Sequence, residues 1–382
     1  MAKNKSPTGK YKQSVLVAVL PYRRTLGSIS MKRFNHLYEK VYDIDNLRKA
    51  HKNASKGKGW YYEVKEINKD PDRYLYQLQD MLKNKTYHTS QYVNFLKVES
   101  PKERLISKLP YFPDRICHWA LLQVIEPILL RNFIADTYSA MPNRGIHYGM
   151  KRLLRDMKND PAGCKYCLKL DMKKYYPSIN HTILKQKYAR LIKDKDLLWL
   201  IGEIIDSTAG DTGIPIGNYL SQYSGNLYLS GFDHWIKEVK RVKHYYRYMD
   251  DIVILSDSKE QLHELIRDIK AYAHQELRLN VKENWQIFPT FVRGLDFLGY
   301  RFFRGYILLR KTTYQNMRKK LRALRKKVER GRKMNFHEWC SISSYNGWLT
   351  HCNSYRLYKA YIYPLEPYAE EYYLSNIRGK NA

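Results

Sequence analysis

The sequence has little cysteine, no long hydrophobic run and few acidic residues for its length. Five cysteines in 382 residues argue against a secreted disulfide framework, so we expect a cytoplasmic protein. The longest purely aliphatic run covers residues 15–20, whereas a membrane helix needs about 20 consecutive apolar residues. No small-residue cleavage site follows that run, which argues against a secretory signal peptide. We therefore expect no membrane partner.

Basic residues are abundant instead. Lys plus Arg number 68 against 37 Asp plus Glu, which gives a formal net charge of +31. The simplest explanation is a polyanionic partner, most commonly nucleic acid. The hydrophobic fraction of 44% is too high for a disordered basic tail, and the length suggests two or three folding units. Charge alone does not separate an enzyme from a ribosomal or packaging protein.

Hydrophobic spacing divides the chain into helical and extended segments. Residues 32–100 show a mixed, mainly helical pattern. Apolar residues at helical spacing predict further helices over residues 116–133, 148–157, 194–206, 220–238 and 259–276. Apolar or alternating runs predict strands over residues 166–170 (half-buried), 245–249, 252–255, 297–303 and 306–309.

Three carboxylates stand at the ends of these predicted strands. Asp171 directly follows the strand at 166–170, and Asp250 and Asp251 form the tight acidic turn of a hairpin. Rigid strand ends would hold these groups together, where they would repel one another unless divalent cations neutralised them. Mg²⁺ prefers carboxylates plus substrate phosphate oxygens, so the pattern predicts two-metal nucleotidyl transfer. For any one of these residues alone, a turn cap or a pair with a basic side chain is the simpler explanation.

Several segments resemble bacterial reverse transcriptases, in the order in which that family carries them. RYMDD is similar to the family's catalytic hairpin, LDMKKYYPSI to its first catalytic motif, and GIPIGNYLSQYSGNLYL to its glycine loop and following helix. FLGY resembles the primer-grip element, and SKLPYFPDRICHWAL and NRGIHYGMKRL resemble fingers segments. The resemblance implies an α+β right-hand polymerase with fingers, palm and thumb, an antiparallel palm sheet backed by helices, and a helical basic thumb.

The same resemblance implies the activity and the metal site. An RNA-directed DNA polymerase uses a template RNA, a DNA or RNA primer and deoxynucleotides. Two Mg²⁺ ions, for which Mn²⁺ is a possible substitute, would be held by Asp171, Asp250 and Asp251, with the Met172 carbonyl as a further ligand.

Further residues correspond to the family's binding site for the incoming nucleotide. Lys102 and Arg104 match residues that hold the triphosphate, and the alternative is a solvated surface pair. Lys282 matches a lysine near the leaving pyrophosphate, although Glu283 stands where the family usually has Thr. Tyr176 falls at the sugar-discriminating position, where a bulky ring would exclude a ribose 2′-hydroxyl; the alternative is an ordinary buried tyrosine.

The glycine loop and the start of its helix supply Ile216, Gly217 and Gln222. Retroviral and group II intron enzymes usually carry Gln where this chain has Ile216. Isoleucine offers shape but no polar contact, so we expect lower fidelity, unless this side chain only packs on the loop.

The segment 304–333 contains 13 Lys and Arg against one acid. Apolar residues recur there at helical spacing, so one helix face is apolar and the rest basic. We interpret it as a thumb helix along the template–primer backbone, rather than a merely solubilising face. Its candidate nucleic-acid-binding residues are Arg318, Lys319, Arg322, Arg325 and Lys326.

The expected organisation has four parts. These are a basic N-terminal arm (1–30), fingers and the start of the palm (31–160), the palm (161–303), and the thumb with the C-terminal tail (304–382). The C-terminal part is too short for an additional RNase H or endonuclease domain, so we expect neither.

Two residue pairs bear on the subfamily. Ile216-Gly217 and Ser221-Gln222 are similar to diversity-generating retroelement enzymes. That resemblance implies copying of a template-repeat RNA with errors opposite adenines, and a small basic pentameric accessory variability protein as partner. Two alternatives stay open: a defence-associated, anti-phage bacterial reverse transcriptase, and a non-catalytic RNA-binding protein resembling a maturase.

Overall fold

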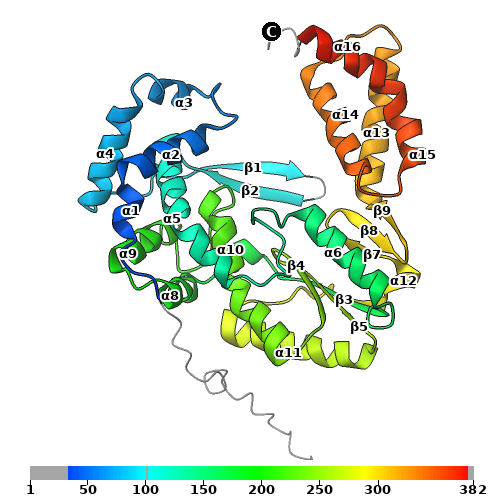
Figure 1. Cartoon of the computed structure of the whole chain (residues 1–382), viewed down its shortest axis with the longest axis horizontal. Coiled ribbons are helices and arrows are strands. Elements are labelled where there is room, and N and C mark those ends of the chain that lie inside the picture. The colour runs from blue at the N-terminus through cyan, green and yellow to red at the C-terminus, as the bar shows by residue number, and fades with distance from the viewer. Residues whose placement is uncertain (1–32, 100–101, 377–382) are drawn as a thin grey trace, which may run out of the picture.

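The computed structural model describes residues 33–99 and 102–376. Within these ranges, helices combine with three antiparallel sheets, which confirms the α+β class (Figure 1). The expected basic arm (1–30) lies outside the described residues. Within the described ranges, no helix is both long and apolar enough to cross a membrane.

The N-terminal part is mainly helical. Its helices are α1 (Tyr38–Tyr42), α2 (Ile44–Ser55), α3 (Tyr62–Ile67), α4 (Pro71–Lys83) and α5 (Ile116–Asn132). The α2 helix begins after Asp43, whose side chain accepts two backbone N–H groups of the first turn. The α5 helix matches the helix predicted over residues 116–133.

A β-hairpin interrupts this helical part and corrects the helical expectation for residues 32–100. It consists of β1 (Val93–Glu99) and β2 (Lys102–Lys108), paired antiparallel with Leu96 opposite Leu105. The hairpin projects away from the helices in Figure 1. Helical periodicity cannot predict it, because apolar residues lie on both faces and several of them are exposed.

A four-stranded antiparallel sheet forms the centre of the molecule, in the order β4-β5-β3-β6. Its strands are β4 (His244–Tyr248), β5 (Asp251–Ser256), β3 (Tyr166–Asp171) and β6 (Gln286–Pro289). Leu168 and Ile254 belong to a core shared with α5, whereas Cys167 and Val253 belong to a second core on the opposite face. Both faces of β3 are therefore covered, and the half-buried strand predicted there is more deeply buried than expected.

Helices cover the two faces of this sheet. They are α6 (Ile146–Asn159), α7 (Tyr175–Ser178), α8 (His181–Leu191), α9 (Lys195–Ile205), α10 (Tyr219–His234), α11 (Lys259–Leu277) and α12 (Thr290–Arg293). The α6 helix contributes to the second core, and α8 to α11 contribute to the first. A π-helical turn (Trp235–Val239) continues α10 toward β4.

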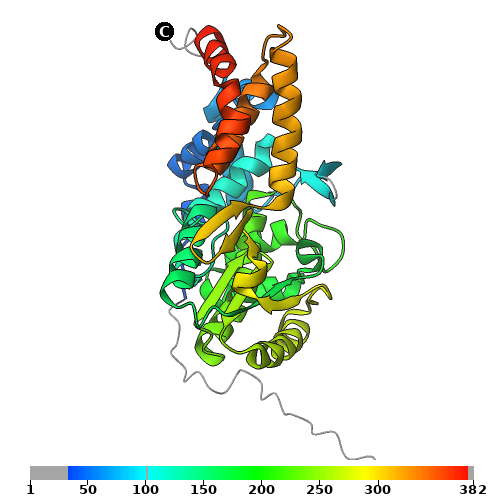
Figure 2. The same ribbon diagram turned by 90° about the vertical axis from the view of Figure 1, so that its right-hand side faces the viewer.

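The C-terminal part begins with a small sheet of β7 (Leu295–Phe297), β8 (Tyr300–Phe303) and β9 (Tyr306–Leu309). The single strand predicted over 297–303 is divided because Leu298 and Gly299 both adopt positive φ and form a turn. The helices that follow are α13 (Lys311–Val328), α14 (Phe336–Leu349), α15 (Tyr355–Leu357) and α16 (Glu366–Asn376). Figure 2 shows α13 as a long helix that rises from this sheet.

Candidate active site

The central sheet brings the three predicted carboxylates together. Asp171 ends β3 and lies directly opposite Asp251, the first residue of β5. Asp250 occupies the turn between β4 and β5. Burial, a side-chain hydrogen bond with Asp171 and the charge of Asp171 raise the pKa of Asp250 to about 7. Residues far apart in the sequence therefore form one acidic cluster at the end of the sheet.

Two lysines balance this cluster. Lys282 forms an ion pair with Asp171, and its backbone N–H donates to the Asp171 carbonyl at 2.9 Å. The Lys169 ammonium lies 3.5 Å from Asp251 Oδ1 and donates to the Asp296 carbonyl. Burial raises the pKa of Asp251, while Lys169 acts in the opposite direction. The cluster thus contains a cationic partner for each strand-end carboxylate.

The acidic cluster also contains oxygen atoms that can bind a cation. Asp171 Oδ1 and Asp251 Oδ1 are buried atoms without a hydrogen-bond partner among the described residues. No three His, Cys, Asp or Glu side chains form a ready metal cage in the part of the chain that the structure describes. Mg²⁺ at phosphate-transfer sites commonly takes only one or two carboxylates and completes its shell with substrate oxygens and water. The carboxylate oxygens present therefore fit Mg²⁺.

A cleft of about 820 Å³ opens beside the cluster. Besides Asp250 and Asp251, it is lined by five of the residues predicted to bind the nucleotide: Arg104, Tyr176, Ile216, Gly217 and Gln222. Lys282 reaches the same region through Asp171. The Lys102 side chain lies outside the described residues. Met172 is fully buried and faces Val281 across an isolated β-bridge.

The glycine loop is attached to the β-hairpin. The Ser107 N–H donates to the Ile216 carbonyl at 2.9 Å. Gly217 has φ +133°, and a Cβ added there would lie 2.5 Å from the Ser107 carbonyl oxygen. Only glycine allows this close approach, so the loop brings Ile216 and β2 to the same wall of the cleft.

Tyr176 also lines the cleft. Its hydroxyl lies 3.5 Å from Met249 Sδ and donates to it, and burial raises its pKa. Met249 immediately precedes the acidic pair and adopts φ +53°. The ring therefore stands beside the carboxylate turn within the cleft.

The basic residues predicted on the thumb helix lie elsewhere. The exposed positions of α13 include Arg318, Lys319, Arg322, Arg325 and Lys326. The opposite side of α13 is buried in the second core through Met317, Leu321, Leu324 and Val328. These cations do not line the cleft, so α13 forms a separate basic face.

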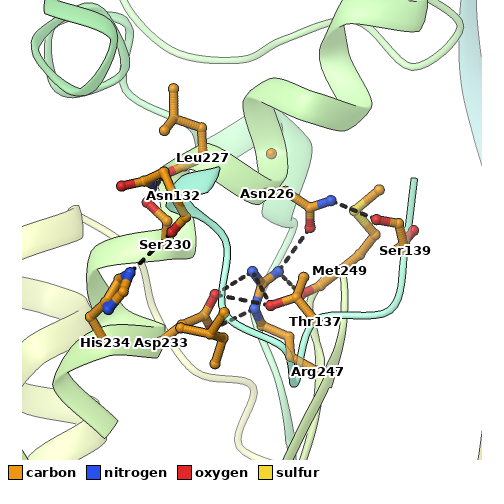
Figure 3. Close-up of polar contacts among 12 residues, drawn as sticks. Asn132, Thr137, Ser139, Asn226, Leu227, Ser230, Asp233, His234, Arg247 and Met249 are labelled. Atoms are coloured by element: carbon orange, nitrogen blue, oxygen red, sulfur yellow. Dashed lines mark hydrogen bonds and ion pairs between the residues drawn. The ribbon is translucent and has the colours of Figure 1, made fainter. Parts of the chain in front are cut away.

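Two residues close to the carboxylates were not identified from the sequence. Lys169 precedes Asp171 by two positions on β3, and the period of two in a strand is the signal that could have revealed it. Arg247 lies in β4 and is completely buried in a polar network (Figure 3). Arg247 stands in a strand whose other residues are mostly buried, and a basic residue in such a strand indicates a buried polar partner.

Comparison with known proteins identifies the family represented by these motifs. Residues 96–302, more than half of the chain, match the sequence profile described as "Reverse transcriptase (RNA-dependent DNA polymerase)". The chain is 23% identical over 241 residues to Protein YkfC of Escherichia coli K12, covering 51% of this chain and 62% of that protein. It is 21% identical over 344 residues to the group II intron-encoded protein LtrA of Lactococcus lactis, covering 70% of this chain and 56% of that protein.

Among solved structures, apo telomerase from Candida tropicalis is similar, with a TM-score of 0.47 and 14% identity. That similarity covers 59% of this chain and 48% of the telomerase chain. The chain spans less than two thirds of the length of each of these relatives.

Proposed function

This chain belongs to the reverse transcriptase family and has its right-hand polymerase fold, and we propose that it extends a DNA or RNA primer with deoxynucleotides along an RNA template. The observation that carries this proposal is that Asp171 lies against Asp250 and Asp251, and that these two residues line one cleft. The net charge of +31 supports nucleic acid as the substrate.

In the proposed mechanism, the three carboxylates and the Met172 carbonyl would hold two Mg²⁺ ions, or Mn²⁺ in their place. Bound there, the ions would supply the positive charge that favours deprotonation of the primer 3′-hydroxyl and departure of the pyrophosphate. Lys282, already paired with Asp171, supplies a positive charge beside the site where pyrophosphate leaves.

The remaining residues of the cleft bind and select the nucleotide. Arg104, together with Lys102, holds the triphosphate through charge-assisted hydrogen bonds. The Tyr176 ring excludes a ribose 2′-hydroxyl, which favours deoxynucleotides. Gly217 and Gln222 shape the wall on which Ile216 meets the base pair.

Primer extension by the Asp250→Asn variant tests this proposal. We expect a loss of at least about a hundredfold in rate, because the amide cannot supply the negative charge that the metal requires. Asp257→Asn is the matched control, since Asp257 is exposed just beyond the other end of β5. Extension that is indifferent to Asp250→Asn would instead favour the non-catalytic RNA-binding alternative.

For the subfamily, we propose a diversity-generating retroelement enzyme that acts in the cytoplasm of a bacterial or phage-infected cell. The supporting observation is that Ile216 and Gly217, which replace the usual Gln-Gly pair, line the cleft. Its further partner would be the pentameric basic accessory variability protein.

Sequencing of cDNA made from the cognate RNA separates the subfamily proposal from the defence-associated alternative. Errors concentrated opposite template adenines, from a template that nearly repeats a target gene, would support diversification. An even error spectrum from a template without such a counterpart would favour a defence role.

A further inference from the structure

Arg247 is completely buried on β4, just before the turn that carries Asp250 and Asp251. The Arg247 and Asp233 side chains are both 0% exposed. Arg247 Nε donates to Asp233 Oδ1 at 2.7 Å, and Nη2 donates to Oδ2 at 2.5 Å. This bidentate contact joins β4 to the last turn of α10 and fixes the plane of the guanidinium (Figure 3).

The remaining donor group of Arg247 points at the carboxylate turn. Nη1 donates to the Met249 carbonyl at 3.0 Å and to Asn226 Oδ1 at 3.1 Å. Met249 has φ +53°, a left-handed conformation that a methionine adopts reluctantly. The Met249 carbonyl also belongs to the peptide group that leads into Asp250. The guanidinium therefore holds the backbone at the point where the chain turns toward the acidic pair.

The network also reaches the segment that borders the cleft. Asn226 Nδ2 donates to the Ser139 carbonyl at 2.7 Å, and Ser139 lines the cleft. The Arg247 N–H donates to the Asp136 carbonyl, and the Tyr138 N–H donates to the Arg247 carbonyl, both at 3.0 Å. One side chain and its backbone thus connect α10, the carboxylate turn and the 136–139 segment.

We propose that Arg247 is a positioning residue: its contact with the Met249 carbonyl sets the backbone that carries Asp250 and Asp251, with Asp233 as the anchor. The proposal rests on the function proposed above, because it assigns Arg247 a role in the same site. Besides its ion pair with Asp233, the guanidinium donates to this carbonyl, so its contacts reach the turn as well as the anchor. A planar guanidinium is required because its donors point in fixed directions, toward the Asp233 carboxylate and the Met249 carbonyl at once.

The test uses the full-length Arg247→Lys variant. Lysine keeps the charge and a contact with Asp233, but one ammonium cannot also hold the Met249 carbonyl in the same geometry. We expect backbone amides at residues 249–251 to exchange hydrogen about tenfold faster in the free protein, with β7–β9 unchanged. In primer extension, kcat should fall about ten- to a hundredfold, while KM for the deoxynucleotide changes less than about threefold.

Two matched variants separate positioning from stability. Arg152→Lys alters a half-buried arginine that pairs with the Asp136 carboxylate at 2.7 Å; it leaves the Asp136 backbone carbonyl on the Arg247 N–H and makes no contact with the turn. It should lower the urea midpoint without changing exchange at 249–251 or kcat. If Arg247→Lys does not fold, Asn226→Ala removes the neighbour that shares Nη1 and should produce the same pattern at smaller amplitude. Ser230→Ala is its control on α10, because the Ser230 hydroxyl donates to the Leu227 carbonyl.

The proposal is overturned if exchange at 249–251 stays at the wild-type rate in both Arg247→Lys and Asn226→Ala. It is also overturned if Arg247→Lys and Arg152→Lys lose kcat in proportion to their loss of stability alone. Exchange is measured without nucleotide or metal, so an inactive wild-type protein would refute the proposed function while exchange still decided whether Arg247 holds the turn.

Discussion

At the scale of single residues, the candidate active site is a balance of opposite charges. Three carboxylates would repel one another in a partly buried site, and the raised pKa of Asp250 records that repulsion together with burial. Lys169 on β3 and Lys282, which lies between α11 and β6, offset part of it. The carboxylates would attract the metal ions of a bound nucleotide, and the two lysines would attract its phosphates. The site therefore favours a substrate that carries both signs of charge.

The side chain of Ile216 gives the prediction at this scale. Its backbone carbonyl already accepts the Ser107 N–H, so a substitution alters the cleft wall and leaves the loop attached to β2. We expect Ile216→Gln to reduce errors opposite template adenine about tenfold, because a glutamine amide can make the polar contact that isoleucine lacks.

Sequencing of products from a defined RNA template measures this error rate. Ile216→Val is the control, since it trims the side chain without adding a polar group, and it should leave the error rate near that of the wild type. Equal error rates for the glutamine variant and the wild type would contradict the role given to Ile216.

At the scale of elements, the strands that carry the carboxylates could be predicted from the sequence. The β1–β2 hairpin and the contacts of Arg247 could not. The apolar runs before Asp171 and around Asp250 placed β3, β4 and β5, because buried strands have a strong local signal. The β-hairpin of residues 93–108 has exposed apolar residues and no helical or strictly alternating period, so local pattern missed it. Three partners of Arg247, namely Thr137, Asn226 and Asp233, lie outside β4, and a single sequence does not show that they meet it.

The basic face of α13 gives the prediction at the element scale. Lys319 and Lys326 are exposed on this helix, opposite its buried side. If both contact phosphates, the Lys319→Gln/Lys326→Gln variant should bind a template–primer duplex more weakly, and its log–log salt slope should fall by about 2. Binding assays over a series of KCl concentrations measure the slope.

A double variant on another helix provides the comparison. Lys259→Gln/Arg267→Gln removes the same number of exposed cations from α11. Its salt slope should stay close to that of the wild type. If both double variants lose the same slope, the charge of α13 acts only through the overall field of the protein and not as a docking face.

At the scale of the whole molecule, the central sheet separates two apolar cores. The first joins α5 and α8–α11 to one sheet face, and the second joins α6, the small sheet and α13 to the other. The carboxylate cluster lies at the end of the sheet between them, so both cores position it. The right-hand polymerase fold expected from the sequence is confirmed by the family match.

A buried histidine on α5, which lines the cleft of the candidate active site, makes the stability of the molecule sensitive to acid. His118 on α5 is 3% exposed, its Nε2 has no hydrogen-bond partner among the described residues, and burial lowers its pKa to about 4. The unfolded chain takes up this proton near pH 6.5, whereas the folded protein resists it down to about pH 4. Stability therefore falls as pH drops through this window, by about 3 kcal/mol at full extent.

Urea unfolding at a series of pH values measures this loss. His118→Gln cannot take up the proton, so its stability should depend less steeply on pH between 6.5 and 4, even if it is lower at neutral pH. His51 and His147 also have lowered pKa values through burial, so some pH dependence should remain. His337→Gln, on the exposed side of α14, should keep the wild-type profile. A profile for His118→Gln as steep as that of His337→Gln would show that acid acts on the fold through other groups.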